Sequence, residues 1–210
     1  MILIRKIAFI FIFLNVLACS KPTEIVKEYD DNGNLVLEYQ RRKDDFAKQG
    51  WYKRYYPSGE LNEEAQYVDN KLDGLRTIFF KNGKTQVIEN HTDGKFEGLY
   101  QSFHNNGNLY QEGVYTDNVM NGEWKLYYNT GDLRETVYFI DNQENGPFKE
   151  YYQNGNLRFE GDFEGGDYEV GELKKYDESG ALIAKLKCEI RQAAGEKFSQ
   201  CTTTWRADAK

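Results

Sequence analysis

The sequence predicts an all-β protein built as an elongated array of about seven antiparallel β-hairpin repeats in one open, twisted sheet. Glycines open successive units at a 24-residue period, with one inserted residue before the sixth: Gly50, Gly74, Gly98, Gly122, Gly146 and Gly171. A second glycine follows each of them after nine residues: Gly59, Gly83, Gly107, Gly131, Gly155 and Gly180. A fixed period of this length is typical of stacked repeats that bury apolar side chains against their neighbours.

Each unit is predicted to be a strand, a tight turn and a second strand. A short aromatic run follows the first glycine, as in GWYKRYY, and the second glycine lies in a polar tetrapeptide such as NNGN. Asn or Ser before Gly favours a three-residue hairpin loop, in which a type I turn is closed by a left-handed glycine and a G1 bulge. With the first glycine counted as position 0, this turn pairs position 5 with position 11.

Positions 5 and 11 carry the most uniform side chains of the array. Position 5 is always Tyr or Phe: Tyr55, Phe79, Phe103, Tyr127, Tyr151 and Tyr176. Position 11 is mostly Leu: Leu61, Thr85, Leu109, Leu133, Leu157 and Leu182. Strict alternation would place position 17 on the same face, with Tyr67, His91, Tyr115, Phe139, Phe163 and finally Cys188. The sequence therefore predicts a narrow core formed by positions 5, 11 and 17.

The opposite face is expected to be exposed and aromatic at positions 2 and 6. These positions provide a candidate binding surface: Tyr52, Tyr56, Tyr100, Trp124, Tyr128 and Tyr152. A tyrosine offers a flat ring and a hydroxyl to a sugar or to an apolar side chain of a protein. The simpler interpretation is that these rings pack against neighbouring units, because single surface aromatics are common.

No group of residues predicts catalysis, a cofactor or a metal site. No Ser-His-Asp, Cys-His or paired-carboxylate arrangement stands apart from the repeat. His91 and His104 occupy aromatic positions of the repeat, which disfavours a metal pair. Four aspartates recur with the same period before Asn or Gly: Asp69, Asp93, Asp117 and Asp141. This pattern favours turns over a ladder of calcium sites, because the glycine-rich spacing of calcium-binding repeats is absent.

The N-terminus predicts export and lipidation. Residues 1–18 form a signal peptide with a basic pair and an apolar run, Ile7–Leu14, that is too short to span a bilayer. Ala18 before Cys19 resembles a bacterial lipobox, so we expect Cys19 to carry a lipid and residues 19–24 to form a tether. The alternative is an ordinary signal peptide with a coincidental cysteine. The expected location is the bacterial cell envelope, on the periplasmic face or the cell surface.

The charge of the mature chain disfavours nucleic acid as a partner. Two of the 27 basic residues lie in the signal peptide, which leaves 25 against 34 acidic residues and a net charge of −9. An acidic surface repels phosphate backbones and anionic lipid headgroups. Membrane attachment would therefore come from the lipid on Cys19.

The two ends of the array are expected to differ from its middle. Residues 25–49 form a degenerate capping repeat with a charged insert, residues 50–188 form the regular array, and residues 189–210 form a closing hairpin. A tight turn at Ala194-Gly195 would place Cys188 opposite Cys201. In an exported chain such a pair predicts a disulfide.

The repeating pattern of Gly, an aromatic cluster, Asn-Gly, Leu and a distal aromatic resembles the MORN-repeat variant of bacterial proteins described as YwqK-like antitoxins. The resemblance covers Val26 to Cys188. It implies a protein partner, namely a toxin that the protein neutralises. The expected function is thus a non-catalytic protein-interaction scaffold, and the alternative is a carbohydrate-binding surface protein that uses the aromatic ladder.

Overall fold

A computed structural model describes residues 21–207. Within this range all regular structure is β, in one sheet of sixteen strands that pair antiparallel and do not close on themselves. In chain order the strands are β1 (Thr23–Tyr29), β2 (Leu35–Arg42), β3 (Lys48–Tyr55), β4 (Leu61–Val68), β5 (Lys71–Phe79), β6 (Thr85–Thr92), β7 (Lys95–Phe103), β8 (Leu109–Thr116), β9 (Val119–Met120), β10 (Gly122–Tyr127), β11 (Leu133–Ile140), β12 (Gln143–Tyr151), β13 (Leu157–Phe163), β14 (Glu169–Tyr176), β15 (Leu182–Ala193) and β16 (Glu196–Arg206). The predicted hairpin array is confirmed.

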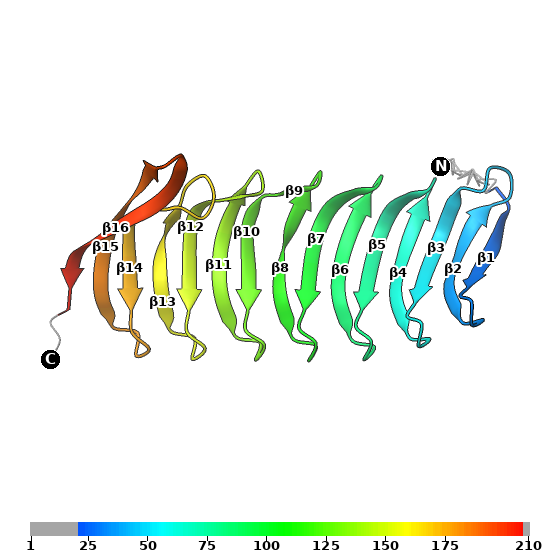
Figure 1. The fold of residues 1–210 in the computed structure, drawn as a ribbon, viewed down its shortest axis with the longest axis horizontal. Coiled ribbons are helices and arrows are strands. Elements are labelled where there is room, and N and C mark those ends of the chain that lie inside the picture. The colour runs from blue at the N-terminus through cyan, green and yellow to red at the C-terminus, as the bar shows by residue number, and fades with distance from the viewer. Residues whose placement is uncertain (1–20, 208–210) are drawn as a thin grey trace, which may run out of the picture.

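The order of the strands in the sheet follows their order in the chain, except that the short β9 pairs only with β8. Figure 1 shows the resulting elongated array, with β1 and β16 at opposite ends. Each repeat contributes one hairpin, and β16 adds a last strand beside β15. No helix within residues 21–207 is long and apolar enough to cross a membrane.

The turns at the lower edge in Figure 1 have the predicted geometry. In the first regular unit the Gly59 N–H donates to the Tyr56 carbonyl at 2.8 Å, and the Tyr56 N–H donates to the Glu60 carbonyl at 2.8 Å. Gly59 has a φ of 98°, which lies in the left-handed region that favours glycine. Position 5 pairs with position 11 as expected, for example Tyr55 with Leu61.

A bulge directly after this pair corrects the predicted core. Arg54 pairs with Glu63 and Tyr55 pairs with Leu61, so Asn62 is an extra residue in the second strand. One extra residue moves every later side chain to the other face of the sheet. Position 17 therefore lies on the face of position 2, and the prediction that it shares a core with positions 5 and 11 was wrong.

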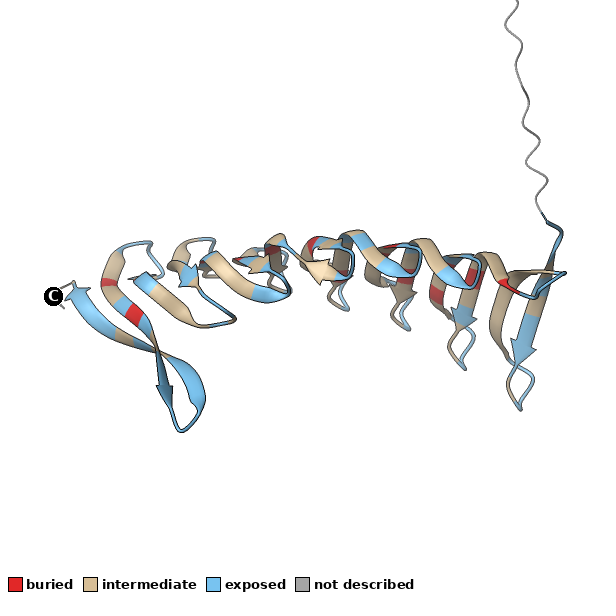
Figure 2. Ribbon diagram, turned by 90° about the horizontal axis from the view of Figure 1, so that it is seen from above, coloured by how far each residue is buried: buried red, intermediate tan, exposed pale blue. Residues whose placement is uncertain are grey.

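The core lies on the face that carries positions 2, 15 and 17, which we call the inner face. Its largest buried side chains are Tyr52, Trp124 and Phe148, with exposed fractions of 3%, 2% and 4%. Figure 2 shows buried residues as short segments in successive hairpins. Rings from positions 2 and 17 contact one another along the array: the ring centroids of Tyr115 and Trp124 are 5.3 Å apart.

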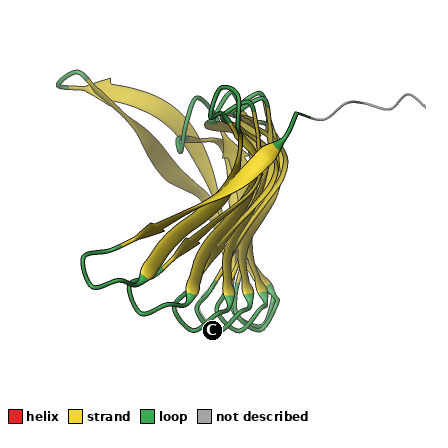
Figure 3. Cartoon of the chain, turned by 90° about the vertical axis from the view of Figure 1, so that its right-hand side faces the viewer, coloured by secondary structure: helices red, strands yellow, loops and turns green. Residues whose placement is uncertain are grey.

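Two features bring the rings of the inner face together. The first glycine of each unit has positive φ, as at Gly74 (113°), and the strands bend, so that the sheet is curved when viewed along its length (Figure 3). The side chain at position 15 is small in the units whose position 2 carries a large aromatic side chain. A Cβ on Gly113 would come within 2.1 Å of the Trp124 ring, so the indole packs directly on the glycine backbone.

Two-residue turns at the upper edge in Figure 1 connect the hairpins from β3 to β13, whereas five-residue loops connect β2 to β3 and β13 to β14. Asp69 and Asn70 both have positive φ, and so do the corresponding residues of later units. Asn70 forms two hydrogen bonds with Lys48 at the start of the preceding hairpin. Its N–H donates to the Lys48 carbonyl, and its Oδ1 accepts from the Lys48 N–H at 2.8 Å. The aspartate side chains pair with lysines, as in Lys71–Asp93. The repeated aspartates thus belong to turns, as expected.

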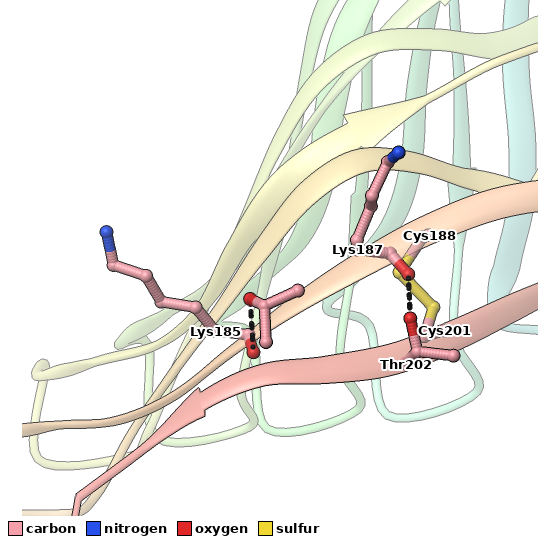
Figure 4. Close-up of a disulfide and its surroundings, with 6 residues drawn as sticks. Lys185, Lys187, Cys188, Cys201 and Thr202 are labelled. Carbon is pink, nitrogen blue, oxygen red and sulfur yellow. Dashed lines mark hydrogen bonds between the residues drawn. A yellow bond between two sulfur atoms is a disulfide. The ribbon is translucent and has the colours of Figure 1, made fainter.

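The ends of the array depart from its regular pattern. Strand β1 begins at Thr23, so the last two residues of the expected tether are already part of the sheet. At the other end β15 and β16 continue past the array as a projecting hairpin, which turns at Ala194 and Gly195. Cys188 pairs directly with Cys201 and forms a disulfide with it (Figure 4). Residues 1–18 and Cys19 lie outside the described residues.

We predict that Gly113→Ala destabilises the protein by roughly 1–3 kcal/mol, because the added methyl overpacks the space that the Trp124 ring occupies. Urea unfolding followed by circular dichroism measures the change. Val114→Ala in the same strand is the control, because Val114 is 47% exposed and its truncation should change stability by less than about 0.5 kcal/mol. Equal stability of the two variants would contradict the packing described above.

Candidate binding surface

The aromatic residues at position 2 are core residues and not a binding surface. Tyr52 and Trp124 are almost completely buried, and Tyr100 packs against Trp124 with ring centroids 5.8 Å apart. The bulge accounts for this result, because it turns position 17 onto the same face and the two sets of rings cover each other. These three side chains do not present flat faces to a ligand.

The aromatic residues at position 6 link neighbouring hairpins. The hydroxyls of Tyr56, Tyr128 and Tyr152 donate to the carbonyls of Phe79, Tyr151 and Tyr176 at 2.8, 2.7 and 2.9 Å. His104 makes the equivalent contact from Nε2 to the Tyr127 carbonyl at 3.1 Å. The six predicted surface aromatics therefore hold the repeats together, and the carbohydrate-binding alternative loses the ladder on which it depended.

A buried ionic cluster interrupts the aromatic inner face in one unit. Arg76 replaces the aromatic of position 2 and donates to Glu63 and Glu89, each at 2.6 Å. Glu63 and Glu89 are 5% and 3% exposed, and His91 Nε2 lies 3.0 Å from the Glu89 carboxylate. Burial alone would lower the pKa of Arg76, but the hydrogen bonds to both carboxylates outweigh it and raise the pKa.

Both carboxylates of this cluster have a partner, whereas the buried Nδ1 of His91 has none within the described residues. Each carboxylate is held by the guanidinium, and a buried carboxylate without such a partner would be costly. Among residues 21–207 no three His, Cys, Asp or Glu side chains are arranged to hold a metal ion. The sequence contained the signal for the cluster, since Arg76 and Glu89 break the aromatic and small-residue pattern of positions 2 and 15.

The opposite face, which we call the outer face, carries positions 1, 3, 14 and 16 of each unit, together with positions 5 and 11, which the sequence predicts to lie in the core. Across the sheet, positions 3 and 14 form a continuous row of directly paired residues: Lys27, Glu38, Lys53, Glu64, Thr77, Ile88, Gln101, Glu112, Lys125, Thr136, Lys149 and Glu160. We call these residues the transverse row. Charges of opposite sign alternate from Lys27 to Glu64, whereas Thr77, Ile88 and Gln101 are uncharged. Thr136 separates Lys125 from Lys149, and beyond Glu160 the row continues with two lysines, Lys174 and Lys185.

The middle of the outer face is apolar. Leu75, Leu99 and Val114 lie on β5, β7 and β8 with exposed fractions of 48%, 43% and 47%, and Asn90 of β6 lies between Leu75 and Leu99. Ile88 on β6 is half-buried in the neighbouring row, between the polar residues Thr77 and Gln101. We call the four apolar residues, Leu75, Ile88, Leu99 and Val114, the outer patch. Glu112 is the one charged side chain at positions 1, 3, 14 and 16 of β5 to β8. An apolar centre with a charged rim is the usual composition of a protein–protein interface.

The outer face is also electrically neutral, although the chain is acidic. Six lysines at positions 1, 3, 14 and 16 of the regular units are matched by six acidic residues: Lys53, Lys125, Lys149, Lys174, Lys185, Lys187, Glu64, Glu112, Glu123, Glu160, Asp162 and Glu172. The net negative charge of the chain therefore lies elsewhere, at the edges and on the inner face. A partner that contacts the outer face meets no overall repulsion from it.

Tyrosine hydroxyls fix several of the carboxylates in the transverse row. Tyr55 donates to Glu38 at 2.6 Å, and Tyr127 donates to Glu112 at 2.8 Å. Burial and these hydrogen bonds raise the pKa of both tyrosines to about 12. The hydrogen bond from Tyr55 also lowers the pKa of Glu38. The rim of the outer patch is thus held in a defined geometry.

Comparison with known proteins identifies the repeat. Four segments of the chain match the MORN repeat variant: residues 48–69, 96–117, 120–141 and 144–164. The unit between the first two matches contains Arg76, Glu89 and His91 of the ionic cluster. No curated protein matches the sequence.

Two solved structures show a remote likeness to the chain. A porin-like protein from Bacteroides uniformis is 9% identical, with a TM-score of 0.22 over 88% of this chain and 98% of that one. The TcdB2-TccC3 structure is 13% identical, with a TM-score of 0.18 over 87% of this chain and 13% of that one. At these TM-scores neither structure carries an argument about this chain.

We predict that Tyr55 and Tyr127 lose their protons only as the pH rises through about 12, compared with an ordinary value of 10.0. Because their pKa is raised in the folded state, their hydrogen bonds contribute stability fully below about pH 10 and lose it as the pH approaches 12. Ultraviolet absorbance of tyrosinate during an alkaline titration measures the pH at which these tyrosines lose their protons. The Tyr55→Phe/Tyr127→Phe variant should lose part of the late titration, while other tyrosines with raised pKa values, such as Tyr67, still contribute to it. An unchanged absorbance curve above about pH 11 would contradict the assignment.

Proposed function

We propose that this protein is a non-catalytic scaffold, anchored by a lipid in the bacterial cell envelope, that binds a protein partner through its outer face. The observation that carries the proposal is the outer patch, where three large apolar side chains are more than two-fifths exposed in the middle of a neutral face. Elongated repeat arrays offer long surfaces of this kind to partners. The match to MORN-variant repeats supports a scaffold that works by binding.

The residues that most often carry catalysis are accounted for by structure within residues 21–207. Cys188 and Cys201 are joined in a disulfide, and His91 contacts the Glu89 carboxylate. His104 contacts the Tyr127 carbonyl. None of these groups is placed beside a general base and an open cleft, which supports a binding protein over an enzyme.

The finer proposal is that the partner is a toxin or effector, so that the protein acts as an antitoxin or immunity protein. The resemblance of the repeats to YwqK-like antitoxins is its support. A long face with exposed apolar side chains near its centre fits the surface of a folded protein better than a small ligand, because small ligands favour concave, enclosed sites.

Location in the envelope is supported by the first residues of the chain and by the disulfide. Cys19 lies four residues before Thr23, which begins the sheet, and four extended residues span at most about 14 Å. A lipid on Cys19 would hold β1 close to the membrane surface. The Cys188–Cys201 disulfide fits an oxidising compartment outside the cytoplasm.

We predict that Leu99→Asp and Val114→Asp each abolish capture of the protein partner, because each places an unpaired carboxylate in the apolar centre of the interface. Pulldown with the tagged protein from envelope extract, read by mass spectrometry, measures capture. Phe198→Asp is the matched control, since Phe198 is 43% exposed like Leu99 but lies on the projecting hairpin. A partner that binds all three variants equally would exclude the outer patch as the interface.

We predict that Cys19→Ser releases the protein from the membrane fraction, because serine cannot carry the thioether-linked lipid. Fractionation of cells and mass determination of the mature N-terminus measure the effect. Cys188→Ser/Cys201→Ser is the control, in which membrane attachment should persist while the disulfide is lost. Unchanged attachment of the Cys19→Ser protein with an unmodified N-terminus would show that the cysteine carries no lipid.

A further inference from the structure

We propose that a second copy of this chain packs on the outer face, with the two arrays antiparallel and related by a two-fold axis parallel to the strands. The inference rests on the proposed function, because it names an occupant for the outer face. The axis would pass between β6 and β7, at the middle of the transverse row. Isologous packing of this kind requires a face that is complementary to itself when its order is reversed.

The charges of the transverse row meet this requirement. The two-fold axis reverses the transverse row of the second copy about the point between Ile88 and Gln101. Glu64, Glu38 and Lys27 of one copy then lie opposite Lys125, Lys149 and Glu160 of the other. The remaining pairs join a charged or polar residue to an uncharged one: Lys53 with Thr136, Thr77 with Glu112, and Ile88 with Gln101. No like charges meet anywhere along this row, which favours the arrangement because like-charge contacts across an interface are strongly unfavourable.

The apolar residues of the second row, at positions 1 and 16, match in the same arrangement. The same reversal sets Leu75 against Val114 of the second copy, and Trp51 against Tyr138. A strand-parallel axis keeps each row at its own height along the strands, so both rows are matched by one operation. Within the outer patch, Leu75 and Val114 would thus cover each other, whereas Leu99 would meet Asn90 and Ile88 would meet Gln101 of the second copy.

The overlap of the two arrays sets an upper limit on the area of the dimer interface. Twelve strands, from β1 to β13 without β9, span roughly 58 Å at about 4.8 Å per strand, and four residues along a strand span about 13 Å. These dimensions give roughly 750 Å² per copy, close to the 800 Å² of a standard interface. Twist makes the ends of two packed sheets diverge, so Glu64 and Lys125 near the centre contribute most among the charged pairs.

Charge reversal tests the arrangement in purified protein that carries Cys19→Ser, so that no lipid contributes to association. Sedimentation velocity should show a dimer. Glu64→Lys and Lys125→Glu should each weaken dimerisation by on the order of tenfold or more, because each creates two like-charge contacts per dimer. The Glu64→Lys/Lys125→Glu variant should restore it, because the pair is again opposite in charge.

Lys185→Glu is the matched control, since Lys185 extends the same row beyond the overlap and should leave the dimer unchanged. A monomer at all concentrations would overturn the inference, and so would a dimer that tolerates both single reversals or a double reversal without rescue. Because the dimer would cover Leu75 and Val114, a different protein would bind the outer patch of the monomer, and mass spectrometry in the pulldown distinguishes that protein from a second copy of this chain. The pulldown with Leu99→Asp therefore tests the proposed function separately.

Discussion

The structure depends on one extra residue in the second strand of each hairpin. In the first unit this residue is Asn62, and it reverses the face of everything that follows it. Without the bulge, the rings of Tyr52 and Tyr67 would lie on opposite sides of a single sheet, and neither side would have a core. With the bulge, their centroids are 5.3 Å apart, and repetition of this contact gives a continuous inner core. The same reversal leaves the other face free for partners.

Most of the fold was predictable from the sequence because local rules determine it. The Gly59 turn, the pairing of Tyr55 with Leu61 and the facing of Cys188 and Cys201 all follow from turn chemistry and counting. The core was not predictable from alternation, because the bulge at Asn62 has no distinctive residue type. A polar residue in a strand does not indicate from its type alone that it is unpaired. The side chains that follow Asn62 were therefore assigned to the wrong face of the sheet.

The candidate site was missed for the same reason. With the faces exchanged, the sequence predicted that Trp124 is exposed, and it did not predict that Leu99 and Val114 belong to a binding surface. Single apolar residues at positions 1 and 16 are not conspicuous in the sequence, since most units have a charged or polar residue there. They become a patch only when β5 to β8 are side by side and the register is known. The neutral charge of the outer face likewise depends on knowing which residues share it.

The agreement between strand order and chain order has a consequence for the evolution of the molecule. Every hairpin pairs only with the hairpins directly before and after it, and from β3 to β13 the hairpins are joined by the same two kinds of turn. Duplication or deletion of one period would reconnect equivalent ends and would leave the neighbours undisturbed. The length of the protein can therefore change in steps of about 10 Å, the width of two strands. The number of repeats, which sets the length of the array, can therefore change independently of the residues on its faces.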